Sequence, residues 1–374
     1  MDQPRKVLIF HASAGHGHEK AAKAIFEAFR ESYPSESVEL CDALKIIPPL
    51  VARFYKWNYY FQIKRAPWMW GGFYFTFDQG WLYGFTKLLR RFINGALGGP
   101  LEKFIETQNP AVIVSTHFLP VEVANFLKTK SRVRSKIVVA VTDYLPHHVW
   151  LGSEVDFYVV AAEDTKKGLI ERGVASEKIK VLGIPVEKKF LLPLSKLELC
   201  KKLSLRQNLF TVLITSGGAG YGETHKIVEG ILSLKKPIQV IVVCGTNKAL
   251  HAHMTKTYEG RPLIKIFGFV ANMDELMEVS DLVMGKGGGI TVTESLVKGR
   301  PVMVFKPVPG QESRNAFFVE EHHVGFATNS MKEAVAKVSD FYDNPEKLDQ
   351  MRKNSKLVVK PQASLEIAEL AHRL

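Results

Sequence analysis

The chain contains two successive series of short apolar runs, and segments with helical spacing separate the runs within each series. The runs of the first series are residues 6–10, 38–40, 111–115, 136–141, 157–160 and 179–182, and several of them are rich in Val and Ile. Such runs are typical of parallel strands that are buried on both faces of a sheet. The runs of the second series are residues 210–214, 239–243, 263–267, 281–284 and 301–304. The alternation predicts an α/β protein with two doubly wound, Rossmann-like domains, whose ligand sites lie at the carboxyl ends of the strands and face a shared cleft.

A polar, lysine-rich stretch separates the two series. It follows residues 183–186 and extends to about residue 208, and its composition is typical of an interdomain linker. We therefore expect domains at residues 1–186 and 187–374. The last segment, residues 363–374, has the pattern of an amphipathic helix. We expect this helix to pack back on the first domain.

Composition limits the classes of protein that fit. The three cysteines, Cys41, Cys200 and Cys244, form neither a disulfide framework nor a zinc pattern, and the histidines show no metal-ligand spacing. The apolar run near the N-terminus is too short, and is too soon interrupted by glycine, for a signal peptide. No window approaches the roughly 18 apolar residues of a membrane-spanning helix. The net charge of +12 is concentrated in residues 51–136, where 13 Lys and Arg face four acids. A localised basic region favours an anionic partner surface.

Residues 53–91 form an aromatic and basic segment. Within them, residues 54–85 contain 15 aromatic side chains in 32 positions. Rings placed among cations suit the interface of a bilayer, and each Lys or Arg near an anionic membrane contributes roughly 1 kcal/mol to binding. The residues that we expect to bind a membrane are Trp57, Arg65, Trp68, Trp70 and Trp81. The alternatives are a helical core that buries about half of the rings, and RNA binding by base stacking, for which the sequence contains no nucleic-acid module.

The segment from residue 286 onward suits a sugar nucleotide. The glycines at 287–289 let the backbone approach a ligand, and a helix expected over residues 291–298 would present its free amides and dipole to a diphosphate. Glu294, in the first turn, could accept hydrogen bonds from a ribose. Gln311 and Glu312 offer the amide donors and carboxylate acceptors that sugar hydroxyls need. A glycine run alone fits an ordinary helix start equally well, but its combination with these polar residues is more specific.

Two further glycine-rich turns follow the first strand of each series. Residues 15–18, Gly-His-Gly-His, lead into a helix, where a neutral imidazole could act as a general base toward an acceptor hydroxyl. Spacing alone does not separate His16 from His18, and a histidine that only caps the helix would give the same pattern. The second turn contains Gly217 and Gly218, which could contact phosphates or allow close packing.

Together these motifs resemble the family of processive diacylglycerol glucosyltransferases and monogalactosyldiacylglycerol synthases, relatives of the lipid-linked N-acetylglucosamine transferase of peptidoglycan synthesis. The resemblance covers almost the whole chain and rests on residues 15–18, 141–144 with His147 and Trp150, 183–185, 243–247, 286–294, and 306–312 with Asn315. It implies a GT-B fold, with a nucleotide sugar on the C-terminal domain and a lipid acceptor on the N-terminal domain. It also implies an inverting transfer without an essential metal.

The resemblance assigns roles to individual residues. His18 matches the catalytic base, and the diphosphate loop is matched by Gly287, Gly288, Gly289 and Ile290, with Thr291 completing it. Glu294 matches the ribose-binding acid, and Gln311 and Glu312 match the sugar-binding pair. The acceptor side comprises Gly15, Gly17, Asp143 and His147. Gly287 departs from the pattern, because relatives usually carry proline or another small residue there.

The expected reaction transfers glucose or galactose from a UDP-sugar to diacylglycerol with inversion, by a peripheral enzyme on the cytoplasmic face of an anionic membrane. His18 would deprotonate the acceptor hydroxyl, and the helix amides would stabilise the leaving diphosphate, so that no cofactor or metal is needed. The alternatives are another lipid acceptor such as a polyprenyl-diphosphate-linked sugar, a nucleotide-sugar epimerase, and a non-catalytic sensor. We expect no nucleic-acid partner, and the choice between glucose and galactose stays open.

Overall fold

The computed structural model describes residues 5–65, 67–78, 99–217 and 223–374, apart from a few side chains in residues 63–77. The chain divides into two compact units. Unit 1 comprises Met1–Lys188 and Lys360–Leu374, and unit 2 comprises Lys189–Val359. The boundary lies two residues after the expected one at 186, and the chain returns to unit 1 for its last 15 residues.

Unit 1 is built on a six-stranded parallel sheet in the order β2-β1-β3-β4-β5-β6. The strands are β1 (Lys6–His11), β2 (Ser37–Asp42), β3 (Val112–Ser115), β4 (Lys136–Ala140), β5 (Phe157–Val160) and β6 (Ile179–Val181). Successive side chains of a strand point to opposite faces. In β1, Val7 and Ile9 therefore enter one core, whereas Leu8 and Phe10 enter the other.

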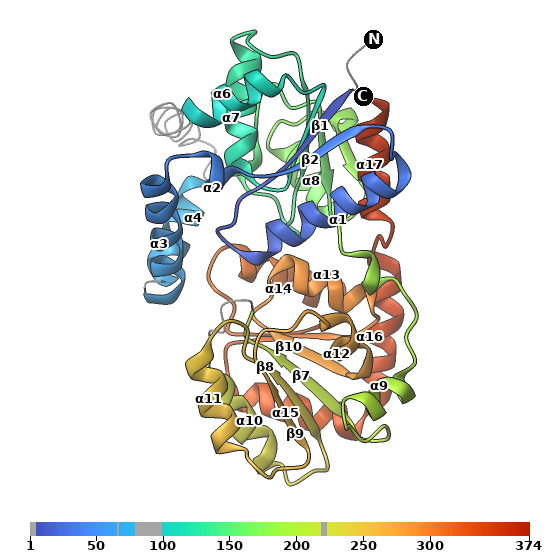
Figure 1. Cartoon of the computed structure of the whole chain (residues 1–374). Helices are drawn as coiled ribbons and strands as arrows, with labels where there is room; N and C mark the ends of the chain where they lie inside the picture. Colours follow the sequence, from blue (N-terminus) through green and yellow to red (C-terminus); the bar gives the residue numbers. More distant parts are fainter. Residues whose placement is uncertain (1–4, 66, 79–98, 218–222) are drawn as a thin grey trace. The chain divides into compact units, whose positions relative to one another are not determined.

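Helices cover both faces of this sheet. On one face, α1 (His16–Ser32) and α17 (Ala363–Arg373) lie side by side (Figure 1). Ile25 and Phe29 of α1 meet Ile367 and Ala371 of α17 in the same core. The other face is covered by α2 (Ala43–Ile46), α6 (Gly99–Gln108), α7 (Phe118–Thr129) and α8 (Glu163–Glu171), with the short helices η2 (His148–Trp150) and η3 (Ser176–Lys178) in the loops.

The aromatic segment forms a pair of helices in unit 1, α3 (Pro49–Arg65) and α4 (Pro67–Phe77), which stand at one edge of the unit (Figure 1). The inner face of α3 packs on the core through Ala52, Tyr55 and Tyr59. Its outer face carries exposed apolar side chains at the helical spacing i, i+4, i+7 and i+11. These are Leu50, Phe54, Trp57 and Phe61.

Unit 2 has a second six-stranded parallel sheet, in the order β12-β11-β10-β7-β8-β9. Its strands are β7 (Thr211–Thr215), β8 (Gln239–Val243), β9 (Ile264–Phe267), β10 (Leu282–Gly285), β11 (Val302–Phe305) and β12 (Gly325–Thr328). The sequence pattern did not predict β12. An edge strand pairs on one side only, and the two middle residues of β12 are only partly buried, so it lacks the Val and Ile run of a central strand.

The helices of unit 2 alternate with its strands. The core on one face includes α10 (Thr224–Ser233), α11 (Lys248–Thr257) and α15 (Met331–Asp343). Two further helices, α12 (Met273–Val279) and α13 (Gly289–Val297), contact the sheet and are in turn contacted by α9 (Lys196–Lys202) and α16 (Pro345–Val358). The short helix η4 (Lys188–Phe190) precedes α9, and α14 (Gln311–Glu321) lies between β11 and β12.

Each sheet reverses its direction of winding beside its first strand. In unit 1 the strand β1 lies between β2 and β3, and in unit 2 the strand β7 lies between β8 and β10. In open α/β sheets the crevice at the carboxyl ends of the strands, at this switch point, is the usual ligand site. The fold therefore places a candidate site at the loops that follow β1 and β3 in unit 1, and β7 and β10 in unit 2.

Candidate functional site

In unit 1, His18 lies at the switch point between β1 and β3. It is the third residue of α1, and its ring Nδ1 is 2.5 Å from the backbone oxygen of Thr116, which follows β3. The hydroxyl of Thr142 lies 3.2 Å from the same nitrogen. Since a carbonyl oxygen only accepts hydrogen bonds, Nδ1 carries the proton and Nε2 keeps its lone pair. The structure thus holds His18 in the tautomer that a general base requires.

Thr116 holds His18 at two points. Besides accepting from the ring, Thr116 donates its hydroxyl to the backbone oxygen of His18 at 2.8 Å, and its own side chain is fully buried. Burial lowers the pKa of His18 to about 4; the Thr116 carbonyl opposes this shift and His11 adds to it. The imidazole is therefore neutral at physiological pH. The rival histidine, His16, is the first residue of α1 and is partly buried.

The acceptor-side residues that follow β4 are held by their own hydrogen bonds. Asp143 is buried and accepts from the indole Nε1 of Trp150 at 3.3 Å, and the rings of Trp150 and His18 are 6.2 Å apart. His147 accepts at Nδ1 from the backbone N–H of Val149 at 2.9 Å and therefore donates from Nε2 to the backbone oxygen of Tyr74 at 2.8 Å. The Nε2 bond connects α4 to the loop after β4.

A buried carboxylate, Asp78, strengthens this connection and was missed by the sequence analysis. It accepts from the backbone N–H and from ring Nδ1 of His148, each at 2.8 Å, and from the guanidinium of Arg172 at 2.9 Å. These partners are 70 and 94 residues away in the sequence. The only signal was that Asp78 is the sole acid of residues 53–91. Asp78 fixes the end of the aromatic helix pair on unit 1.

The two glycines of the first turn differ in their surroundings. Gly15 has φ −168°, an extended conformation open to any residue, and a Cβ there would lie 3.5 Å from the Tyr59 hydroxyl. Gly17 lies within the first turn of α1, between His16 and His18. Neither the backbone conformation nor the space beside Tyr59 therefore requires glycine at position 15.

In unit 2, the helix after β10 starts earlier than expected. We expected it to begin at Thr291, but α13 begins at Gly289 after the N-cap residue Gly288, which gives no side-chain cap. The first-turn amides belong to Gly289, Ile290 and Thr291, the residues expected at a diphosphate. The prediction that Glu294 lies in the first turn is wrong, because this start moves it into the second turn, where only 1% of it is exposed.

Gly287 gives the loop its shape. Its φ is +91°, a value closed to proline and rare for any residue with a side chain. A Cβ at this position would lie 2.8 Å from Cγ1 of Val304. From α14, the buried side-chain amide of Asn315 donates to the backbone oxygen of Gly287 at 2.9 Å. Glycine is therefore required here, and Asn315 holds the loop in place.

Two ionisable residues beside this loop, Glu312 and Lys286, influence each other's pKa. Glu312 lies in the first turn of α14 and accepts from the backbone N–H of Val308 at 2.7 Å. Burial raises the pKa of Glu312 to about 7, while the Val308 N–H and the ammonium of Lys286 oppose the rise. Burial also lowers the pKa of Lys286, and Glu312 opposes that shift. Gln311 is the first residue of α14.

The loop before α14 has unusual backbone conformations. Lys306 has φ +48°, and Gly310, the N-cap residue of α14, has φ 103° and ψ −114°. Lys306 pairs with Glu223, which also accepts from Lys226 at 2.7 Å. Gly217 has φ +66° and a Cβ there would meet nothing within 4 Å, whereas Gly218 lies outside the described residues. The turn after β7 and the loop after β11 thus flank the loop after β10.

The structure describes the side chains of only two of the five residues that we expect to bind a membrane. Trp57 is 58% exposed and Trp68 is 75% exposed. Arg65 and Trp70 lie in α3 and α4 but their side chains are outside the described part, and Trp81 lies outside the described residues altogether. No helix of the described residues is both long and apolar enough to cross a bilayer. Within the same residues, no group of three His, Cys, Asp or Glu side chains is placed to hold a metal ion.

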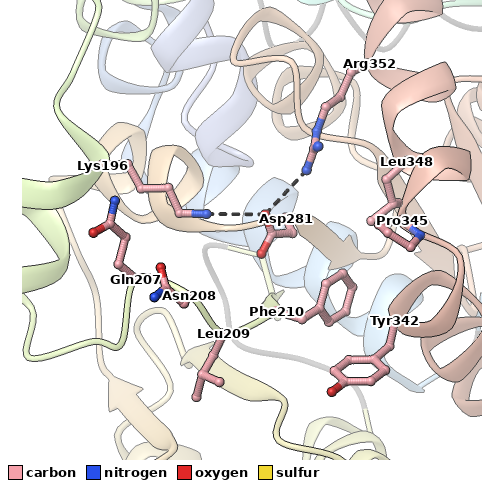
Figure 2. A pocket seen from close by; sticks show the side chains of 10 residues that line it. All are labelled: Lys196, Gln207, Asn208, Leu209, Phe210, Asp281, Tyr342, Pro345, Leu348 and Arg352. Atoms are coloured by element: carbon pink, nitrogen blue, oxygen red, sulfur yellow. Dashed lines mark hydrogen bonds and ion pairs between the residues drawn. The ribbon is translucent and has the colours of Figure 1, made fainter.

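The amino ends of the unit 2 strands carry a pocket of about 300 Å³ (Figure 2). In it, Asp281 accepts from the backbone N–H of Thr211 at 2.9 Å, and its other oxygen pairs with Lys196 at 3.3 Å and Arg352 at 3.4 Å. Figure 2 shows both cations converging on this carboxylate. The pocket lies at the opposite edge of the sheet from the glycine loops, and its ion pairs connect α9 and α16 to the start of β10.

Comparison with known proteins identifies the family of this chain. Residues 18–186 match the model of monogalactosyldiacylglycerol (MGDG) synthase, and residues 211–371 match the glycosyltransferase family 28 C-terminal domain. The chain is 30% identical over 358 residues to a processive diacylglycerol beta-glucosyltransferase of Bacillus pumilus (strain SAFR-032), covering 95% of this chain and 91% of that one. A protein of the same name from Bacillus mycoides (strain KBAB4) is 29% identical and covers 97% of this chain and 92% of its own.

The chain belongs to the family of processive diacylglycerol glucosyltransferases and monogalactosyldiacylglycerol synthases.

Similarity to solved structures shows that this chain has the GT-B fold. MurG of Acinetobacter baumannii superposes with a TM-score of 0.60 at 13% identity, covering 99% of this chain and all of that one. The S. aureus MnaA–UDP structure superposes with a TM-score of 0.62 at 12% identity, covering 97% and 94%. At these identities the likeness concerns the fold, and the expected fold class is confirmed.

Proposed function

We propose that this glycosyltransferase moves a hexose from a UDP-sugar to diacylglycerol, with unit 1 binding the acceptor and unit 2 the donor. The full-length relatives are named as diacylglycerol beta-glucosyltransferases, which favours glucose over galactose as the hexose. The single observation that carries the mechanism is the neutral His18, held by Thr116 with its Nε2 lone pair available. Nucleotide-sugar epimerases share the fold only at 14–15% identity, and this alternative is not favoured.

In unit 1, His18 acts as the general base. Nε2 takes the proton of the acceptor hydroxyl while the hydroxyl oxygen attacks the anomeric carbon from the face opposite the diphosphate, so the configuration inverts. The bond from that carbon to the diphosphate oxygen breaks, and its electron pair leaves with UDP. A base with a pKa of about 4 keeps its lone pair across the physiological range, although a low pKa reduces the driving force for proton transfer. The fixed tautomer compensates by orienting Nε2.

In unit 2, backbone and charge bind the donor. The free first-turn amides of α13 and the positive end of its dipole suit the diphosphate, and Glu294 would accept from the ribose. Gln311 and the carboxylate of Glu312 would bind hydroxyls of the hexose. The ammonium of Lys286, opposite Glu312, supplies positive charge next to the glycine loop. The second glycine turn, with Gly217 and Gly218, would contribute at the neighbouring strand.

The donor site accounts for the leaving-group charge without a metal. In the proposed donor site, amides and one ammonium would meet the negative charge that develops on the diphosphate, so we propose that catalysis needs neither a divalent cation nor another cofactor. Turnover in excess EDTA should equal turnover in added Mg²⁺. A loss of more than tenfold in EDTA, restored by Mg²⁺, would overturn this part of the proposal.

The helix pair α3–α4 would bind the membrane that supplies the acceptor. Four apolar side chains of this pair are between 58% and 77% exposed: Leu50, Phe54, Trp57 and Trp68. Large apolar side chains that gather on a protein surface indicate an interaction surface. Arg53 is exposed beside them, and Asp78 anchors the pair to unit 1. We propose a peripheral enzyme on the cytoplasmic face of an anionic membrane.

Product analysis tests the proposed function. The enzyme is incubated with diacylglycerol in anionic liposomes and either UDP-glucose or UDP-galactose, and UDP release and lipid products are measured by mass spectrometry. We expect a hexosyl-diacylglycerol, formed faster from UDP-glucose. Binding of a UDP-sugar without any transfer to diacylglycerol would move the acceptor to another lipid, such as a polyprenyl-diphosphate-linked sugar.

A further inference from the structure

A second histidine lies beside His18 at the switch point of unit 1. His117 follows Thr116 at the end of β3, and the ring centroids of His117 and His18 are 4.8 Å apart at an interplanar angle of 83°. His117 is 3% exposed, and its ring also stacks on Phe118 with centroids 4.3 Å apart. The parallel pairing of β1 with β3 brings together two histidines that are 99 positions apart in the sequence.

The two imidazoles have opposite tautomers. The backbone N–H of Leu119 donates to Nδ1 of His117 at 3.1 Å, so Nδ1 of His117 holds a lone pair and, in the neutral ring, Nε2 carries the proton. In His18 the carbonyl of Thr116 fixes the proton on Nδ1 and leaves Nε2 as an acceptor. Burial, followed by His18 and His11, holds the pKa of His117 well below its usual value, so this ring stays neutral.

Neither Nε2 atom hydrogen-bonds to any residue of the described part of the chain. One ring can therefore only accept at Nε2, and the other can only donate. A hydroxyl group needs one acceptor for its proton and one donor for its oxygen. An oxygen about 2.9 Å from both Nε2 atoms would lie roughly 4 Å from each ring centroid, and rings 4.8 Å apart are compatible with that triangle.

We propose that His117 is a second catalytic residue, whose Nε2–H donates to the acceptor oxygen while Nε2 of His18 removes that oxygen's proton. This inference rests on the proposed function of His18. As the proton moves to His18, negative charge grows on the oxygen before its bond to the anomeric carbon is complete. The donated hydrogen bond stabilises this charge and also orients the lone pair that attacks. Removing one such donor from other active sites lowers kcat by about 10²–10³-fold.

A structural role alone would also explain the contact of His117 with Leu119. Nδ1 of His117 caps α7, because it accepts the backbone N–H of the second helical residue. The cap uses Nδ1 and the proposed catalytic bond uses Nε2. Two substitutions separate these atoms: Asn places its carbonyl near the position of Nδ1, whereas Gln reaches the position of Nε2 with an amide that can donate.

The test compares His117→Asn and His117→Gln for melting temperature, UDP-glucose affinity and rate of hexosyl transfer. We expect His117→Asn to keep the melting temperature and donor affinity but to lose about 10²-fold in kcat, and His117→Gln to melt lower but lose less than tenfold. Full activity in His117→Asn, or a greater loss of kcat in His117→Gln than in His117→Asn, would overturn the inference. If the Asn variant does not fold, the Gln variant alone tests the inference, at a temperature where it is folded. A 10²-fold loss of kcat in the Gln variant would then overturn the inference.

Two reference proteins distinguish failure of this inference from failure of the proposed function. The unmodified enzyme must produce hexosyl-diacylglycerol, and His18→Ala must not. If the unmodified enzyme makes no such product, the proposed function is wrong. If both references behave as expected and His117→Asn is fully active, only the role of His117 is wrong.

Discussion

The carboxyl ends of the two sheets carry equivalent loops but opposite kinds of chemistry. In unit 1, the switch point holds His18 and His117, both neutral because burial lowers their pKa. In unit 2, it holds two ionisable groups, Lys286 and Glu312, beside the first-turn amides of α13. A group that accepts a proton must not be protonated already, whereas a leaving diphosphate needs fixed positive charge. Under the proposed function, the two units therefore divide proton removal and leaving-group stabilisation between them.

The largest expected effect comes from removing the neutral base. His18→Ala should lower kcat by about 10²–10⁴-fold, while the affinity for UDP-glucose, which depends on unit 2, stays within twofold. Steady-state UDP release and calorimetric binding measure the two quantities. His16→Ala is the matched control and should keep most of the activity. If instead His16→Ala is inactive and His18→Ala active, the base is the rival histidine.

A smaller effect is expected from the glycine loop of unit 2. Gly287→Ala introduces a Cβ 2.8 Å from Val304 at φ +91°, a strain of about 1–3 kcal/mol, so UDP should bind about 10–100-fold more weakly. Gly299→Ala is the control, because its φ of +66° also disfavours a side chain, but it lies outside the proposed donor loop and a Cβ there meets nothing within 4 Å. Calorimetric titration with UDP measures both. Equal affinities in the two variants would mean that the loop does not hold the diphosphate.

The outer face of α3 offers a comparison between two exposed leucines. Leu50 in unit 1 is 77% exposed and Leu357 in unit 2 is 80% exposed. Burying a leucine is worth about 1.5–3 kcal/mol, so Leu50→Ser should weaken binding to anionic liposomes about tenfold, whereas Leu357→Ser should not. Co-sedimentation measures the bound fraction. Undiminished binding of Leu50→Ser would mean that the helix pair contacts something other than lipid.

The last expected effect concerns stability and not activity. The pKa of Glu312 is raised from 4.5 to about 7 in the folded protein, so the folded state binds its proton more tightly than the unfolded state. Below pH 4.5 the carboxyl is protonated in both states, and its ionisation does not affect stability. As the pH rises from 4.5 to 7 the free energy of unfolding falls, and above pH 7 the whole cost of burying the charged carboxylate is present. Glu312→Gln removes that cost and should stabilise the protein by up to about 3 kcal/mol at pH 8.

Denaturant unfolding at pH 8 and pH 4.5 checks this expectation. The stability gain from Glu312→Gln should be present at pH 8 and absent at pH 4.5. An equal gain at both values would show that packing, and not the charge of Glu312, is responsible.

Much of the fold could be predicted from the sequence, because central strands of a parallel sheet need apolar runs on both faces. All six strands of unit 1 and five of unit 2 were predicted, including the edge strands β2, β6 and β9, whereas the edge strand β12 was not. The start of α13 was placed two residues too late, since glycine is a poor helix former and only the tertiary structure makes Gly288 its N-cap residue.

The site was predicted less completely, for a physical reason. Glycine turns and polar residues near them can be recognised locally, but the partners that set their chemistry come from distant strands. Thr116, which fixes the tautomer of His18, is 98 residues away and acts partly through its backbone oxygen, which no sequence pattern marks. The partners of Asp78 are similarly distant.

We propose that a neutral base in unit 1 and an ionising acid in unit 2 divide the reaction. The pH dependence of kcat and of UDP-glucose affinity tests this proposal. We would measure kcat at saturating UDP-glucose, and the dissociation constants of UDP-glucose and UDP, from pH 5 to 8.5. The account predicts a kcat that stays constant down to pH 5, because His18 has a pKa of about 4, and UDP-glucose affinity that falls below pH 7 as Glu312 is protonated. Affinity for UDP, which lacks the hexose, should change little. A kcat that falls with an apparent pKa between 6 and 7, while UDP-glucose affinity stays constant, would contradict the account.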